Sequence, residues 1–485
     1  MPSSAPQPHE NLSPETPRAK VAISPRRMLL PLALAQFICS FAGSNMNVML
    51  NDISEDLNTT VQGVQVAITL FLLVMAALMI PGGKLTDKWG RKRLFTIGLI
   101  VYAIGAVMSA LSPGLGLLIL GNSIFEGVGT ALLIPPVYIL TTLYFTDLSS
   151  RAWAFGVISG LGGIGAAAGP LIGGLITTAI TWRAAFIFLA LVIVAIVLLA
   201  RRIEDPLPAD PDRPFDTAGA ALSAVGLVVL VMGILAADNS LVLMAALIAL
   251  GAAFLAWFFL HVRRRERRGK EPLLSISLFR NRTSNLGLVT QNLQWLMLMG
   301  TSFVVSAYLQ VVRGYSAIGT GVVFTAATVG LLVSSLAAGR LARKRPQATL
   351  IKAGFVLTVA GIALLLVLVR SFSGAWAFTP GLLLIGLGLG VMLTPSVNVV
   401  QSAFPDAQQG EISGLSRSVS NLGSSLGAAV AGTILISGLT SPERAYALAM
   451  IVLGAIGVVG FLVSLFLSPS GAGEDAKAID EKSAA

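Results

Sequence analysis

Long apolar segments alternate with short polar connections from residue 28 almost to the end of the chain. Each segment can form a helix that crosses the hydrocarbon core of a bilayer, which takes about 20 residues. The pattern predicts an all-α integral membrane protein, and an even number of crossings places both termini on the same side. The fourteen predicted transmembrane helices cover residues 28–50, 62–82, 94–112, 115–140, 151–177, 183–200, 217–237, 241–261, 284–311, 317–339, 350–369, 377–401, 411–436 and 444–467.

Composition agrees with a membrane protein and excludes other classes. Only 12% of the residues are charged, whereas soluble domains carry about 25%. The net charge of +10 lies in the connections between spans, so we expect no nucleic-acid partner. No group of His, Cys and acidic residues has the spacing of a metal site, and no catalytic triad or phosphate-loop pattern is present. We therefore expect no enzyme activity, no metal and no cofactor. The single cysteine, Cys39, is expected to be a small buried apolar residue.

The distribution of basic residues predicts the sidedness. Almost all of the 33 Lys and Arg residues fall on the face that carries the N-terminal tail. Cytoplasmic connections are enriched in Lys and Arg, so both termini are predicted to be cytoplasmic. Within this set, the basic run at 263–270 has two interpretations, a topological anchor or a site for anionic lipid headgroups. The exceptions to the rule are Arg183, Arg313, Arg370 and Arg444 on the other face and Arg417 inside a span.

Landmarks in the first part of the chain recur in the second part at a nearly constant offset, which predicts two homologous halves of six helices each. The recurring sets are Gly83–Leu85 with Gly339–Leu341, Gly127, Gly129 and Pro136 with Gly386, Gly388 and Pro395, and Gly165 and Gly169 with Gly423 and Gly427. The predicted organisation is a disordered cytoplasmic N-tail (1–27), an N-terminal half (28–202), two additional helices with charged cytoplasmic connections (203–282), a C-terminal half (283–468) and a cytoplasmic C-tail (469–485).

One connection carries a specific motif. Gly83, Asp87, Gly90 and Arg91 match the G-x-L-x-D-x-x-G-R-K loop of the major facilitator superfamily, which this stretch closely resembles. The 6+2+6 arrangement resembles the fourteen-spanner drug:proton antiporter branch of that superfamily. The resemblance implies two pseudo-symmetric halves, alternating access and a monomer in the plasma (inner) membrane of a bacterium. It also implies that the loop closes the cytoplasmic side, with Asp87 facing the helix that starts near Gly410 and Arg91 paired with Asp147.

The fifth span contains a second motif. Gly165, Gly169, Pro170, Gly173 and Gly174 match the G-x-x-x-G-P-x-x-G-G signature that accompanies antiporters in the superfamily. Glycines four residues apart remove side chains along one stripe, so a neighbouring helix can pack closely. Proline removes one backbone hydrogen bond and bends the helix. We therefore expect a bent helix in tight contact with a neighbour.

Glu126 is the one acidic residue placed well inside an apolar span, where charge is costly and usually functional. It is the predicted proton-coupling residue. The sequence departs from the family here: Ala42 stands where the branch has an acid in the first helix, and the Arg of the fourth-helix pattern is Ser123. Two possibilities stay open, that Glu126 has taken over coupling or that transport is independent of protons. Arg417 is expected to contact an anionic substrate, to pair with Glu126, or to bind backbone carbonyls.

By resemblance, the first and fourth helices of each half line a substrate cavity. The sequence therefore predicts a secondary active exporter of small organic compounds, driven by the proton gradient. The alternative is a proton-independent facilitator or importer of a neutral or lipid-like solute. The candidate cavity residues are Asn45, Asn47, Asn122, Gln291, Asn292, Trp295, Asn398 and Arg417.

Overall fold

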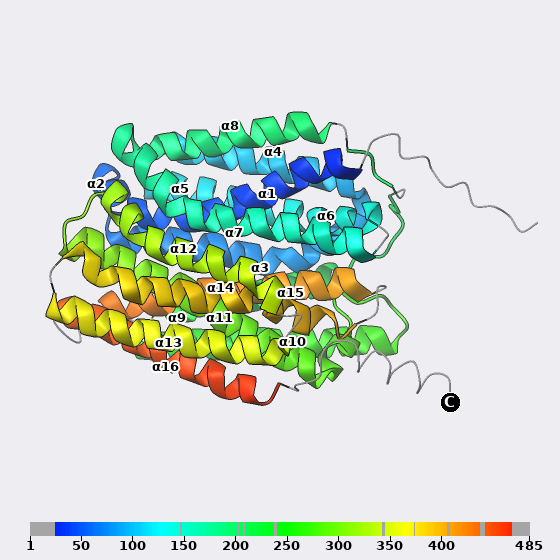
Figure 1. The fold of residues 1–485 in the computed structure, drawn as a ribbon. Coiled ribbons are helices and arrows are strands. Elements are labelled where there is room, and N and C mark those ends of the chain that lie inside the picture. Colours follow the sequence, from blue (N-terminus) through cyan, green and yellow to red (C-terminus); the bar gives the residue numbers. More distant parts are fainter. Residues whose placement is uncertain are drawn as a thin grey trace, which may run out of the picture.

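The computed structural model describes residues 25–145, 148–201, 203–206, 209–236, 240–341, 345–372, 374–404, 408–436 and 442–467. Every regular element among them is helical, which confirms the all-α class (Figure 1). In chain order the elements are α1 (Pro25–Asn45), η1 (Met46–Met49), α2 (Leu50–Asp56), α3 (Val61–Trp89), α4 (Arg91–Ala110), α5 (Leu115–Leu118), η2 (Ile119–Glu126), α6 (Gly127–Tyr144), α7 (Leu148–Ala179), α8 (Trp182–Ala200), α9 (Thr217–Leu235), α10 (Leu241–Arg267), η3 (Ile276–Arg280), α11 (Arg282–Ala307), η4 (Tyr308–Val312), α12 (Ala317–Leu341), α13 (Gln347–Ser371), η5 (Ala375–Phe378), α14 (Thr379–Gln401), α15 (Gln409–Ile436) and α16 (Pro442–Leu465).

The number of spans differs from the prediction. Twelve helices in the described ranges are long and apolar enough to cross a membrane, and α7 makes a thirteenth if its bent parts count as one span. The two parts of α7, Trp153–Ala166 and Ala168–Ala179, meet at 41°, next to Pro170, which cannot donate a hydrogen bond to the Ala166 carbonyl. The predicted count of fourteen is not confirmed, since α15, which carries Glu411, Arg417 and many serines, is not among these helices. The first helix also begins at Pro25, inside the predicted N-tail.

Helix packing in the first part of the chain is repeated in the second. α1 packs against α7, α6 and α8, and α11 packs in the same way against α15, α14 and α16. α4 lies on α6 and α8 as α13 lies on α14 and α16. The recurring glycines allow the same close helix packing in each part. A Cβ at Gly165 would lie 2.3 Å from the carbonyl oxygen of Phe37 on α1, and one at Gly423 would lie 2.3 Å from that of Asn292 on α11. The boundaries of the two halves themselves remain a prediction.

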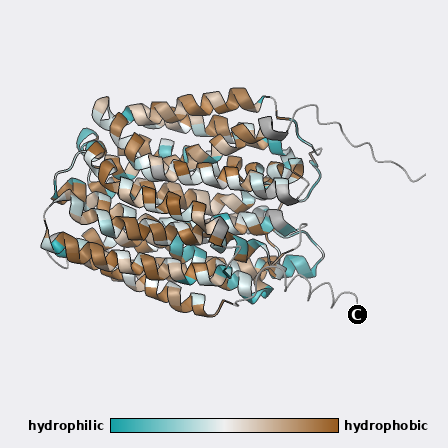
Figure 2. Ribbon diagram, viewed as in Figure 1, coloured by the Kyte–Doolittle hydropathy of each residue, from teal (hydrophilic) through white to brown (hydrophobic). Residues whose placement is uncertain are grey.

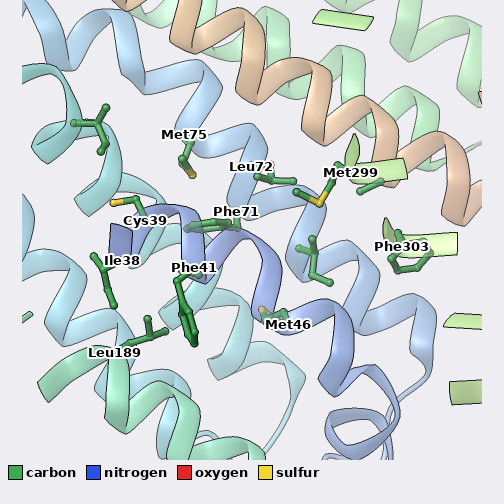
Figure 3. Close-up of a cluster of buried hydrophobic side chains, with 14 of the residues drawn as sticks. Ile38, Cys39, Phe41, Met46, Phe71, Leu72, Met75, Leu189, Met299 and Phe303 are labelled. Atoms are coloured by element: carbon green, nitrogen blue, oxygen red, sulfur yellow. The ribbon is translucent and has the colours of Figure 1, made fainter. Parts of the chain in front are cut away.

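We call α1–α8 the first group of helices and α11–α16 the second group. Two pairs of long helices join these groups, α3 with α15 and α7 with α12 (Figure 1). Hydrophobic colour runs along most of each helix, while hydrophilic colour gathers mainly near the helix ends (Figure 2). Inside, a buried apolar cluster surrounds Phe41 and Phe71 and continues to Met299 and Phe303 on α11 (Figure 3). Cys39 belongs to this cluster and is buried, as expected.

The two additional helices, α9 and α10, pack against each other, and α9 also lies on α3 and α15. Asp216, the N-terminal cap of α9, holds the pair together near the basic connection. Its carboxylate accepts a hydrogen bond from the Gly219 N–H (3.0 Å) and lies 2.9 Å from His261 Nε2 and 3.6 Å from Arg265 Nε. Burial alone would raise the pKa of Asp216, but these hydrogen bonds and the Arg265 charge hold it below its usual value. The carboxylate form therefore stabilises this junction above the ordinary pKa of an aspartate, and the contribution is lost in acid.

Candidate functional site

We call the end of the bundle that carries the connection between α3 and α4 the loop end. The opposite end, which carries the connections at residues 57–60, 180–181 and 313–316, is called the far end. Polar contacts that join the two groups of helices lie at both ends and in the middle.

Glu126 ends a π-helical stretch, η2, and is completely buried. π-Helical turns occur frequently at functional sites. Two glycines bring η2 and α4 together: a Cβ at Gly105 would lie 2.6 Å from the Gly121 carbonyl oxygen. Ser109 of α4 therefore reaches Glu126 and donates a hydrogen bond to its Oε1 (3.2 Å), and the Tyr102 hydroxyl lies beside the same carboxyl. These partners belong to α4, so Glu126 faces the neighbouring helix of its own group.

Arg417 occupies a different place. It reaches from α15 to α6, where its guanidinium donates a hydrogen bond to the Tyr138 hydroxyl and lies over the Tyr138 ring, 4.6 Å from the ring centre. Tyr138 in turn donates to Gln36 Oε1 on α1 (3.1 Å). Among the residues that the structure describes, Arg417 pairs neither with Glu126, which contacts α4, nor with backbone carbonyls, so these two expectations are wrong in this structure. Neither Tyr138 nor Gln36 stood out in the sequence, since single aromatic and amide residues are common in apolar spans.

The predicted cavity residues fall into two groups. Asn47, Gln291 and Asn292 join helices. The Asn47 carbonyl accepts from Ser306 and from Gln310 Nε2 (2.8 Å), Gln291 Oε1 accepts from Ser416 (2.9 Å), and Asn292 Nδ2 donates to the Val419 carbonyl (2.9 Å). Ser306 and Gln310 are partners that the sequence analysis missed.

The second group has no such partner. In the ranges that the structure describes, the buried Asn45 side chain makes no hydrogen bond, and neither does the buried Nδ2 of Asn122. Trp295 and Asn398 are half-buried. Buried amides that lack partners are costly to leave unmatched, and a bound solute or water would match them. Asn45 and Asn122 are therefore the better candidates for solute contact among the predicted amides.

At the far end, the predicted glycine motif of α7 contacts two helices. Gly165, Gly169 and Gly173 face α1: added Cβ atoms would lie 2.3 Å from the Phe37 carbonyl oxygen, 1.9 Å from Ser44 Oγ and 3.0 Å from Asn45 Cβ. Gly174 and Pro170 instead face α12. A Cβ at Gly174 would lie 2.5 Å from the Ala317 carbonyl oxygen, and one at Gly321 would lie 2.4 Å from the Pro170 carbonyl oxygen. The motif therefore packs α7 within its own group and also against the other group.

At the loop end, Lys84 of the sequence motif joins the two groups. Its ammonium lies 2.6 Å from Glu411 on α15 and 3.1 Å from Glu271 in the connection after α10. Glu271 also binds Arg213 (2.9 Å), which precedes α9. Burial would raise the pKa of Glu271, but the hydrogen bonds from Arg213 and Lys84 hold it below its usual value. The sequence analysis missed these ion pairs of Lys84, because the family motif assigns the contact with the second group to Asp87 instead.

The other described residues of this loop contact α6 and the connection after α8. A Cβ at Gly83 would face Pro135 of α6 at 3.8 Å, so Gly83 does not pack against the second group, and Gly82 makes the close contact with the Ala131 carbonyl oxygen (2.3 Å). Gly90 adopts a φ of 88°, which few other residues tolerate. The N–H groups of Arg91 and Lys92 donate to Asp205 Oδ2 (2.6 and 3.2 Å), which caps α4. The Asp87 side chain and Asp147 lie outside the part that the structure describes.

Neutralising the Lys84 link tests its contribution. Lys84→Gln and Glu411→Gln are each expected to weaken closure of the loop end by about 0.5–1 kcal/mol, since both groups are partly exposed. Lys84→Gln has the larger effect because it also loses Glu271. The measurement is cross-linking between cysteines placed at the loop ends of α3 and α15. Lys270→Gln, an exposed basic residue in the same connection, is the control. If the double variant equals the sum of the two single variants, the residues do not interact.

The geometry defines a polytopic helical bundle with contacts between its two groups at both ends and polar residues between the groups. The chain belongs to the Major Facilitator Superfamily, whose model matches residues 32–428. It is a membrane transporter rather than an enzyme. It is 30% identical over 418 residues to the puromycin resistance protein pur8 of Streptomyces alboniger, which covers 84% of this chain and 82% of that protein. It is 29% identical over 447 residues to the multidrug efflux pump LfrA of Mycolicibacterium smegmatis, which covers 90% and 87%.

Solved structures agree on the fold. The crystal structure of a peptide transporter POT (E310Q mutant) in complex with alafosfalin superposes with a TM-score of 0.66 and covers 91% of this chain and 93% of that one. The sequence identity is 18%, so this likeness concerns the fold alone. The fold and the family predicted from the sequence are therefore confirmed.

Proposed function

We propose that this protein is a secondary active exporter of small organic compounds that exchanges its substrate for protons by alternating access. The observation that carries the proposal is family membership together with relatives described as resistance and efflux proteins. A further relative is a probable actinorhodin transporter of Streptomyces coelicolor that is 28% identical over 422 residues. The two sets of contacts between the helix groups support alternating access, since each lies at one end of the bundle.

In this proposal the loop end faces the cytoplasm of a bacterial inner membrane, with both termini on that side. The excess of Lys and Arg at the connections of the loop end supports this orientation. The Lys84 link closes the loop end, while α7, α12 and the Asn47 contacts close the far end. The protein works as a monomer and needs no cofactor, since the proton gradient supplies the energy. The exposed basic residues at 263–270 anchor the connection or bind anionic lipid headgroups.

Glu126 is the proposed proton-coupling residue. The charged form of a carboxyl group is costly in an apolar span. Whether Glu126 binds a proton therefore depends on the groups that surround it. The hydrogen bond from Ser109 and the nearby Tyr102 hydroxyl lie on α4, so movement of η2 against α4 would change those surroundings. Coupling would thus act inside one group of helices, without a direct ion pair across to Arg417.

Transport by everted membrane vesicles tests the proposal. Vesicles that contain the protein are expected to accumulate a fluorescent amphipathic dye when a proton gradient is formed, and to lose it when an ionophore dissipates the gradient. Vesicles from cells without the protein are the control. Accumulation that survives the ionophore would favour the alternative function, a proton-independent facilitator, for which the missing acid at Ala42 is the supporting observation. Absence of transport for every solute tried would contradict both.

A further inference from the structure

Arg417 lies within the bundle, where α15 meets the first group of helices. The next residue, Ser418, donates a hydrogen bond to the Ala76 carbonyl in the middle of α3 (2.5 Å). From there the Arg417 side chain extends to Tyr138 on α6. The residue keeps partial exposure, whereas Ser416 and Ser418 on either side are buried. Part of this residue is therefore accessible where α15 meets α6, although its neighbours in the sequence are buried.

This cation has no counter-charge among the residues that the structure describes. Three acids in or beside the spans have other partners: Glu126 contacts Ser109, Glu411 contacts Lys84, and Asp56 pairs with Arg183 at the far end. The phenol of Tyr138 accepts a hydrogen bond from Arg417 but does not neutralise its charge. An unpaired cation inside an apolar bundle is expensive, so the site favours any anion that can reach it.

Phe155 and Gln36 hold Tyr138, the residue that Arg417 contacts, in a fixed position. The Tyr138 ring stacks on Phe155 of α7 with centres 5.8 Å apart and an angle of 19° between the planes. Gln36 holds the Tyr138 hydroxyl, and its own amide donates to Ser40 Oγ (3.1 Å). Arginine that lies over an aromatic ring keeps N–H groups along its edge, and these suit a carboxylate, which accepts two hydrogen bonds from one guanidinium.

We propose that Arg417 binds the anionic group of a transported organic acid, with the Tyr138–Phe155 pair contacting the aromatic or apolar body of the same molecule. The inference rests on the proposed function and adds a substrate class to it: amphipathic compounds that carry a carboxylate or a similar oxyanion. An inorganic anion would meet the same charge but would gain nothing from the aromatic pair.

A matched pair of dyes tests this assignment. Rhodamine B has a free carboxylate, and its ethyl ester has the same ring system without that charge. Binding of each dye to the purified full-length protein is measured by fluorescence anisotropy. The wild type is expected to bind rhodamine B more tightly than the ester. Arg417→Gln should weaken rhodamine B binding by about tenfold or more and change ester binding by less than about twofold.

Further variants separate charge from structure. Arg417→Lys should keep part of the preference for rhodamine B, because it keeps the charge without the planar fork. Arg370→Gln, at an exposed helix end, should leave both affinities unchanged. Equal binding of the two dyes by the wild type, or equal losses for both dyes in a folded Arg417→Gln protein, would overturn the inference. Failure of the proposed function would show differently, as absence of gradient-driven dye accumulation in vesicles while the binding preference persists.

Discussion

Replacing Glu126 by glutamine should reduce proton-coupled transport to background while the protein still folds and inserts. The amide has nearly the same shape and can still accept the hydrogen bond from Ser109, so packing between η2 and α4 is preserved. It cannot exchange a proton, so substrate movement and proton movement lose their link. The measurement is substrate-driven proton flux in proteoliposomes that contain a pH-sensitive dye, compared with wild type at several external pH values.

Glu55→Gln is the matched control for this change. Glu55 is exposed near the far end, where its carboxyl accepts a hydrogen bond from Asn51 Nδ2 (2.7 Å). The same chemical substitution there should leave transport and its pH dependence unchanged. A Glu126→Gln protein that transports with the wild-type pH dependence would rule out a coupling role and would leave the buried carboxyl as a structural group that binds α4.

The second large effect is expected from Gly174→Val. The added side chain would meet the Ala317 carbonyl oxygen, which lies only 2.5 Å from an ideal Cβ, so α7 and α12 must separate. Overpacking of this kind costs about 1–3 kcal/mol. Since the contact lies at the far end, the variant should favour conformations open at that end and slow transport about tenfold or more. Distances between spin labels at Ile180→Cys and Ser316→Cys report the opening.

Gly163→Val provides the control on the same helix. An added Cβ at Gly163 has no atom within 4 Å in the described part of the structure, so the variant should transport at nearly the wild-type rate. If both valine variants lose the same fraction of the transport rate, the number of glycines in α7 matters more than the contact between Gly174 and α12. An unchanged label distance in Gly174→Val would mean that the far end closes without this contact.

The fold was largely predictable because burial in a bilayer is a local property of each segment. Apolar length alone located nearly every helix, and the repeated glycines indicated the repeated packing that Gly165 and Gly423 show against α1 and α11. Apolar length also located α15, predicted at 411–436 and found at Gln409–Ile436, although the sequence of this helix mixes apolar residues with Glu411 and Arg417. Its polar residues face other helices, so its place in the bundle depends on partners that its own sequence does not contain.

The candidate site was only partly predictable. The sequence showed that Glu126 lies within an apolar span, and the structure finds it fully buried. Its direction could not be read from the sequence, because the π-helical turn and the close approach of α4 decide which helix it faces. For the same reason the sequence did not separate the amides that join helices, such as Asn292, from those without a partner, such as Asn45.

The sequence by itself determined that the chain spans a membrane many times, that it belongs to a family of carriers and which residues are polar where polarity is costly. Hydropathy, spacing and motifs carry that information within a few consecutive residues. Only the tertiary structure decided the partners: Lys84 with Glu411 across the loop end, Gly174 against α12, and Arg417 over Tyr138 with no counter-charge among the described residues. The partners in each pair are more than a hundred residues apart in the chain, and only helix packing brings them into contact.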